Sequence, residues 1–145
     1  MFKRLKNVRG MSLVEIMIVI VIMGTVAALV GRNVISQFEK SKVKTTQLQM
    51  DSIKTALQDY YLDNGSYPTT EQGLIALVQK PAGSPEPANY SPDGYLKGKV
   101  VPKDAWLKDF IYESDGANYS LISLGKDAKE GGEGYGADII FKSNE

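Results

Sequence analysis

The most prominent hydrophobic feature of the chain is an uninterrupted apolar run near its beginning. Residues 16–30 read IMIVIVIMGTVAALV, with no charge and a single hydroxyl at Thr25. Together with residues 12–15 the run covers about five helical turns. This length lies between the ~20 residues of a membrane-spanning helix and the ~7–15 of a signal-peptide core. Four basic residues lie in the ten positions that open the chain, before the run, which predicts a cytoplasmic N-terminus and a C-terminal body outside the cytoplasm.

Beyond Gly31 the chain becomes polar but keeps a helical period. Apolar residues recur at spacings of three and four in two clusters: Val34, Ile35 and Phe38, then Met50, Ile53, Leu57, Tyr60 and Tyr61. We predict one long helix from the membrane segment to about Asp63, ended by Asn64-Gly65. The face at 50–61 is expected to pack on a C-terminal sheet, and the polar stretch at 39–49 to face solvent or another subunit.

The rest of the chain predicts short elements. Thr69 to Gln72 match a capping box that opens a second short helix, which Pro81 stops. Residues 81–104 contain five of the six prolines and predict a loop packed across the body. Two β-type runs flank Asp115-Gly116, which predicts a two-residue type I′ hairpin, and residues 139–141 could add a third strand. The fold class is therefore α+β.

Composition narrows the chemistry. The chain has 145 residues, no His and no Cys, so imidazole catalysis, thiolate metal sites and disulfides are excluded. Any bound metal is expected to be a hard cation with oxygen ligands. The 17 basic and 17 acidic residues cancel, but four of the basic ones lie in residues 1–10, leaving a mildly acidic remainder. An acidic body argues against nucleic acid as a partner.

Glu15 is the one carboxylate at the start of the apolar run, and three interpretations compete for it. The run could be a cleaved signal peptide, with Thr25-Val26-Ala27 as its cleavage site, or a simple membrane anchor with Glu15 among the headgroups. In the third interpretation Glu15 has a partner, because a carboxylate costs about 2.5–3.5 kcal/mol at the centre of a membrane helix and somewhat less near its end.

The segment Arg9-Gly10-Met11-Ser12-Leu13-Val14-Glu15 resembles the prepilin signal of type IV pilins and pseudopilins. The resemblance implies a leader, residues 1–10, that a prepilin peptidase removes between Gly10 and Met11, followed by methylation of the new amine. Residues 11–31 would be the retained membrane and filament-core helix, and residues 32–145 the extracytoplasmic body. It also implies that Glu15 pairs with the N-terminal amine of a neighbouring subunit. The family usually has Phe at the position of Met11.

A glycine-rich acidic stretch covers residues 126–138, with four carboxylates and four glycines. Glycines allow the backbone to fold back tightly, so that carboxylates and carbonyls converge as calcium requires. The spacing is not that of an EF-hand. On chemistry alone, both a calcium site and an ordinary solvated loop remain open.

Residues 67–74, YPTTEQGL, resemble a signature of the major pseudopilin family of type II secretion systems (general secretion pathway protein G), and so do residues 101–106, 123–127 and 131–139. The resemblance implies a type IV pilin-like fold and one structural Ca²⁺ in the loop before the last strand. It implies Asp127 and Asp138 as side-chain ligands and the carbonyl of Leu124, with Ser123 and Glu133 as weaker candidates. Asp104-Ala105-Trp106-Leu107 departs from the family's Asp-Pro-Trp-Gly, so we expect the turn there to differ.

The resemblance implies a structural subunit that polymerises with itself from the bacterial inner membrane into a periplasmic filament and drives export of folded proteins. Its other partners would be minor pseudopilins, the inner-membrane assembly platform and the prepilin peptidase. The alternatives are a type IV pilin for adhesion or motility, although major pilins commonly carry a C-terminal Cys pair, and a conventionally secreted binding protein. Acid pairs such as Asp104 and Asp109 do not predict an enzyme, because exposed loop acids are far commoner than catalytic pairs.

Overall fold

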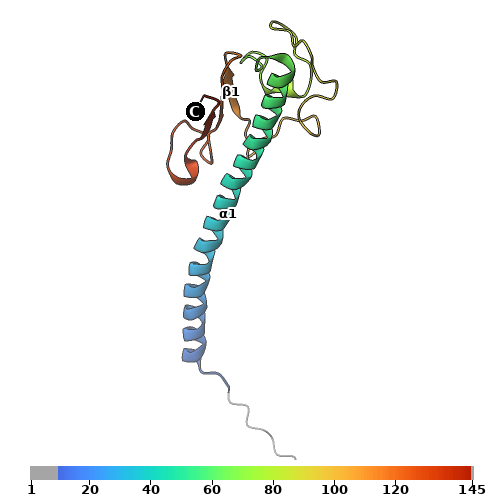
Figure 1. Ribbon diagram of the computed structural model, residues 1–145. Helices are drawn as coiled ribbons and strands as arrows, with labels where there is room; N and C mark the ends of the chain where they lie inside the picture. The colour runs from blue at the N-terminus through green and yellow to red at the C-terminus, as the bar shows by residue number, and fades with distance from the viewer. Residues whose placement is uncertain (1–9, 145) are drawn as a thin grey trace, which may run out of the picture. The chain divides into compact units, whose positions relative to one another are not determined.

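The computed structural model describes residues 10–144, apart from the side chain of Arg32. Its main element is the helix α1, Leu13–Asn64, 52 residues long (Figure 1). Gly65 follows with a φ of 77°, and its amide donates to the Tyr61 carbonyl at 2.7 Å. The predicted long helix and its glycine cap are confirmed. The predicted leader, residues 1–9 with Gly10 at its end, lies almost entirely outside the described residues.

The chain divides into two compact units, residues 1–38 and 39–145. In the first unit, the large hydrophobic side chains between Met11 and Val30 are all 41–74% exposed. This part of α1 is long and apolar enough to cross a membrane, with a mean hydropathy of 2.7. Helical hydrogen bonds satisfy its backbone internally, so no other element is needed to complete it.

The second unit, which we call the body, holds the hydrophobic core. The C-terminal part of α1 contributes Ile53 and Leu57, both fully buried, together with Met50, Ala56 and Tyr60. Against this face lie Tyr112, Tyr119 and Leu121 of the sheet, and the ammonium of Lys54 lies 3.9 Å from the ring centre of Phe141. The expectation that the face at 50–61 packs on the sheet is confirmed.

The sheet has three antiparallel strands in the order β1-β2-β3: β1 Ile111–Ser114, β2 Tyr119–Ser123 and β3 Ile139–Lys142. Tyr112 pairs with Leu121, which pairs with Phe141, so one register row lies on the core side. The predicted third strand is therefore confirmed. Side chains alternate in strands, so Ile111, Ile122 and Ile140 form a row on the opposite face.

The predicted two-residue type I′ turn is wrong. Ser114 pairs with Tyr119, so four residues connect β1 to β2. Gly116 has a φ of 87°, but Asp115 is not among the residues with positive φ. Instead the Oδ1 of Asp115 accepts hydrogen bonds from the amides of Ala117 and Asn118 at 2.9 and 2.7 Å. An Asx-type side-chain bond thus replaces the second left-handed residue that the type I′ turn requires.

The predicted capping box is present. The amide of Gln72 donates to Thr69 Oγ1 at 3.3 Å, and the amide of Thr69 donates to Gln72 Oε1 at 3.0 Å. It precedes a single 3₁₀ turn, η1, Leu74–Leu77, rather than an α-helix. The loop 81–104 packs on the body as expected: Leu96 is buried in the core, and the rings of Tyr90 and Tyr95 contact that of Tyr60.

The polar stretch 39–49 does not face solvent throughout. Glu39 is 7% exposed and Thr46 is fully buried, because segments far along the chain cover them. The Oγ1 of Thr46 accepts a hydrogen bond from the amide of Ala105 at 3.1 Å. The expectation for this stretch is therefore wrong at these two positions, where polar side chains bind loops of the body.

Candidate cation site in the glycine-rich loop

The loop between β2 and β3 folds back on itself. The amide of Lys126 donates to the Tyr135 carbonyl at 3.1 Å, which closes the loop at its base. A single 3₁₀ turn, η2, Gly134–Gly136, lies at its far side, and the amide of Gly136 donates to the Glu133 carbonyl at 3.1 Å. These bonds bring residues about ten positions apart in sequence to the same place.

Asp127 contacts the glycines of this loop. Its Oδ1 accepts a hydrogen bond from the amide of Lys129 at 3.1 Å. A β-carbon built on Gly132 or Gly136 would lie only 3.1 or 2.9 Å from Asp127 Oδ2. Glycine at these positions therefore lets the backbone approach the carboxylate closely, which a side chain would prevent.

Asp138 approaches the same turn from the other end of the loop. Its Oδ2 accepts a hydrogen bond from the amide of Gly131 at 2.8 Å. Its Oδ1 is buried and has no hydrogen-bond partner. A buried carboxylate oxygen without a partner is costly, and a cation would satisfy it. This unsatisfied oxygen is the observation that fits a bound metal.

The other candidate ligands are placed less favourably. Ser123 is fully buried; its hydroxyl donates to Asp104 Oδ2 at 2.8 Å and accepts a hydrogen bond from the amide of Gly125 at 3.4 Å. Glu133 is exposed and makes no side-chain cap on η2. Leu124 is half-buried directly after β2. Within residues 10–144 no three or more acidic side chains converge on one point. A hard cation would thus need carbonyl and water oxygens besides Asp127 and Asp138, a donor set that suits Ca²⁺.

Three side chains to which the sequence assigned no role at this site form hydrogen bonds or ion pairs around the loop: Asp104, Lys126 and Glu39. For Asp104 the expectation of an exposed loop acid is wrong, because other segments bury it. Asp104, 2% exposed, accepts hydrogen bonds from the amides of Trp106 and Lys108 as well as from Ser123. Lys126 Nζ lies 2.8 Å from Oε1 of Glu39 on α1. A usable signal did exist for Glu39, because it is the single carboxylate between Glu15 and Asp51 along the helix.

Leu107 has a φ of 64° and a side chain that is 79% exposed. It stands where the resembling family usually has glycine, and its amide donates to the Asp104 carbonyl at 3.0 Å. The left-handed conformation that glycine adopts at no cost is thus adopted here by a leucine.

The N-terminal candidates lie in the first unit. Gly10 and Met11 are exposed and precede α1, and Glu15 is exposed in its first turn. A carboxylate in the first turn is favourably placed toward the positive end of the helix dipole. Processing at Gly10 and Met11 and pairing of Glu15 stay predictions.

A long helix with an exposed apolar N-terminal part, continued into the core of a small antiparallel sheet, defines a type IV pilin-like subunit. Two family models match the sequence: the prokaryotic N-terminal methylation motif over residues 5–31, and type II secretion system (T2SS) protein G over residues 33–142. The chain belongs to the type II secretion system protein G family.

Known proteins agree with this assignment. The chain is 46% identical over 132 residues to the type II secretion system core protein G of Pseudomonas aeruginosa, covering 90% of this chain and 92% of that protein. It is 43% identical to the Vibrio cholerae core protein G over 139 residues, 94% of this chain and 93% of that protein.

Among solved structures, the major pseudopilin of the type 2 secretion system of enterohaemorrhagic Escherichia coli aligns with a TM-score of 0.62 and 34% identity, over 74% of this chain and 92% of that one. The family is one of structural pseudopilins rather than a known enzyme family, and neither a type IV pilin of another system nor a conventionally secreted protein is favoured.

Proposed function

We propose that the chain is the major structural subunit of a type II secretion pseudopilus. Subunits would wait in the inner membrane and then polymerise into a periplasmic filament that drives folded proteins through the outer membrane. The observation that carries this is the apolar helical segment of the first unit, whose side chains find no cover within the described chain. Helical polymers arise from head-to-tail contacts that do not close, and such contacts would bury this surface.

The mature subunit would begin at Met11. A prepilin peptidase would cut after Gly10, removing four basic residues and leaving 13 basic against 17 acidic ones. The basic leader would keep the N-terminus in the cytoplasm and place the body in the periplasm. Minor pseudopilins and the inner-membrane assembly platform would be the further partners.

Glu15 would set the register between subunits by pairing with the N-terminal amine of a neighbour. The Coulomb attraction between a carboxylate and an amine is stronger in an apolar surrounding than in water. A buried carboxylate therefore needs such a partner to offset the cost of its removal from water. The test is Glu15→Ala in cells that express the secretion system, with filaments counted by electron microscopy and membrane insertion followed by fractionation. We expect filaments to be lost while insertion is kept.

Glu113→Ala is the matched control, because it removes an exposed carboxylate from β1 instead. It should leave filaments intact. Wild-type filament numbers from Glu15→Ala would refute the role of Glu15 in register.

We infer that the glycine-rich loop binds one structural Ca²⁺ through Asp127 and Asp138, with the Leu124 carbonyl as a further donor and Ser123 and Glu133 as weaker ones. The unsatisfied Oδ1 of Asp138 and the close approach of Asp127 to Gly132 and Gly136 support this assignment. The ion would neutralise the two carboxylates and fix a loop that has no disulfide.

The calcium proposal is tested by thermal unfolding of the full chain in detergent micelles, with calcium and after chelation. Ligands that bind only the native state raise its stability, so chelation should lower the melting temperature. Asp127→Asn should melt at the temperature of the chelated wild type and ignore added calcium. Identical melting temperatures of the wild type with and without calcium would refute the calcium proposal.

A further inference from the structure

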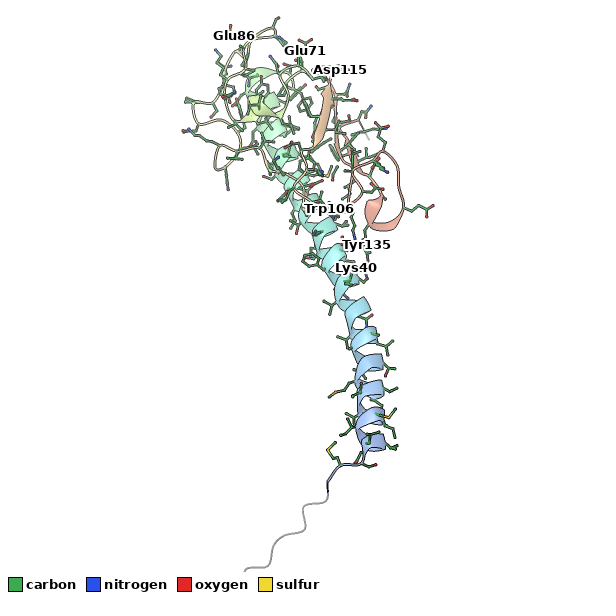
Figure 2. All side chains as sticks on the ribbon, turned by 180° about the vertical axis from the view of Figure 1, so that it is seen from behind. Lys40, Glu71, Glu86, Trp106, Asp115 and Tyr135 are labelled. Atoms are coloured by element: carbon green, nitrogen blue, oxygen red, sulfur yellow. The ribbon has the colours of Figure 1, made fainter. Side chains whose placement is uncertain are left out.

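The glycine-rich loop lies beside one turn of α1. At the base of the loop, Lys126 Nζ lies 2.8 Å from Glu39 Oε1. At its far side, Gly134 and Tyr135 line one open hollow together with Lys40 and Val43 of the helix. Figure 2 shows Tyr135 and Lys40 next to each other on this side of the helix. The helix turn 39–43 therefore faces the loop and is tied to it by the Lys126–Glu39 pair.

Glu39 is unusually enclosed for a helix carboxylate. Its side chain is 9% exposed, whereas that of Lys126 is 53% exposed. The hydrogen bond from Lys126 is the largest influence on Glu39 and lowers its pKa below the usual value, although burial acts in the opposite direction. The second oxygen, Oε2, is buried without a hydrogen-bond partner, and so is the indole Nε1 of Trp106, a residue that also lowers the pKa of Glu39. Glu39 is thus an ionised group held between the loop and the 104–107 turn.

Lys126 is the residue at the base of the loop, directly before Asp127. Its backbone amide closes the loop on the Tyr135 carbonyl at 3.1 Å, and its carbonyl side continues directly into Asp127. Fixing the Lys126 side chain on the helix therefore restricts the backbone that carries Asp127. Restricting a ligand-bearing loop before binding lowers the entropy that binding has to remove.

We propose that Glu39 is a positioning residue for the cation site: by holding Lys126 on the helix it orders the start of the loop and presents Asp127 for calcium. This inference rests on the calcium site proposed above. Coupling of this kind is reciprocal, so calcium binding also strengthens the contact between the loop and helix turn 39–43. Calcium bound in the loop therefore changes how tightly the loop is held on turn 39–43 of α1.

Simple electrostatics predicts a different outcome, which makes the proposal testable. Lys126 is a positive charge adjacent to Asp127, so its removal should tighten calcium binding if only charge matters. If Lys126 acts by ordering the loop, its removal should weaken calcium binding. The two explanations differ in sign at the same residue.

The experiment measures calcium affinity by isothermal titration calorimetry on the full chain in detergent micelles. The variants are Glu39→Gln, Lys126→Met and Lys126→Arg, each checked for folding by near-ultraviolet circular dichroism. Glu86→Gln is the matched control, because it breaks an exposed ion pair with Lys80 of similar length, 2.7 Å. We expect Glu39→Gln and Lys126→Met each to weaken binding about fivefold, at the lower end of typical coupling between sites. Lys126→Arg and Glu86→Gln should bind as the wild type does.

Trp106, the single tryptophan of the chain, supplies a second readout beside Glu39. Calcium should shift its fluorescence in the wild type and in Glu86→Gln but not in Glu39→Gln. Wild-type affinity in Glu39→Gln, or tighter binding in Lys126→Met, would overturn the proposal while leaving the calcium site intact. A wild type that binds no calcium would overturn the site itself and this inference with it. Should Glu39→Gln fail to fold, Lys126→Met decides, since it breaks the same pair from the exposed side.

Discussion

The two parts of α1 have similar backbones and opposite surroundings. Between Leu13 and Val30 the large apolar side chains are 41–74% exposed, whereas Ile53 and Leu57, further along the same helix, are fully buried. The body part gains its stability from packing within the chain, which is how most amphipathic helices are stabilised. The N-terminal part has nothing in the described chain to pack against. In the function proposed above, this apolar surface is covered from outside the subunit, first by lipid and then by neighbouring helices.

The difference predicts that substitutions of the same kind have opposite consequences in the two parts. Leu57→Ala creates a cavity in the core and should lower the free energy of unfolding of the body by about 2–5 kcal/mol. Leu29→Ala, at a side chain that is 66% exposed, should leave the unfolding of the body unchanged. Chemical denaturation of the full chain in micelles, followed by near-ultraviolet circular dichroism, measures both. An equal loss of unfolding free energy in the two variants would contradict the claim that only the body part of α1 is stabilised by packing within the chain.

Alkaline pH should likewise act on the body, which contains all eight tyrosines. Burial, and then the neighbouring Tyr67, raises the pKa of Tyr119 from 10.0 to about 12. A raised pKa means that the folded state favours the neutral phenol. The contribution of Tyr119 to stability is therefore complete below pH 10 and is lost as the pH rises toward 12.

Tyr119→Phe removes this titration. At about pH 11 the wild type should have lost about 1 kcal/mol that the variant keeps, since one pKa unit corresponds to 1.36 kcal/mol. Unfolding curves at neutral pH and at about pH 11 provide the measurement, and the helical signal of the N-terminal segment should not change between them. A loss at high pH that is the same in both proteins would exclude Tyr119 as its source.

The smallest expected effect concerns backbone strain, which the body contains and the described N-terminal helix does not. Leu107 is one of three non-glycine residues with positive φ within residues 10–144, and all three lie in the body. Leu107→Gly should raise the free energy of unfolding by up to about 1 kcal/mol, because the left-handed conformation costs leucine about 1–2 kcal/mol and glycine loses more chain entropy on folding. Ile140→Gly, at another exposed apolar side chain, should destabilise instead. Denaturant midpoints of the two variants decide the sign.

The sequence was a good guide where one signal decided the outcome. The helical period ended by Asn64-Gly65, the Thr69–Gln72 capping box and the β3 run each correspond to local geometry that few other residues would adopt. It failed at Asp115-Gly116, because the same dipeptide also suits a longer turn in which the Asp115 side chain replaces the second left-handed residue. A local pattern does not distinguish these two solutions.

Burial of polar residues was harder to predict, because it depends on distant segments. Glu39 and Thr46 read as surface positions on a polar helix, and their partners, Lys126 and Ala105, lie 87 and 59 residues further along the chain. The hydroxyl of Ser123 was considered as a ligand, but the structure pairs it with Asp104. For Asp127 and Asp138, the resemblance supplied the candidate pair and the structure supplied its surroundings, namely the glycine contacts and the unsatisfied Oδ1.

The central claim is that the exposed apolar helix is retained in the working protein and is covered by other subunits. Mass spectrometry and N-terminal sequencing of the mature chain, isolated from cells with an intact secretion system, test it most directly. We predict a chain that begins at Met11 and carries a methylated amine. A mature chain that begins near Ala28 would mean that the helix is discarded as a signal peptide, and would contradict the account.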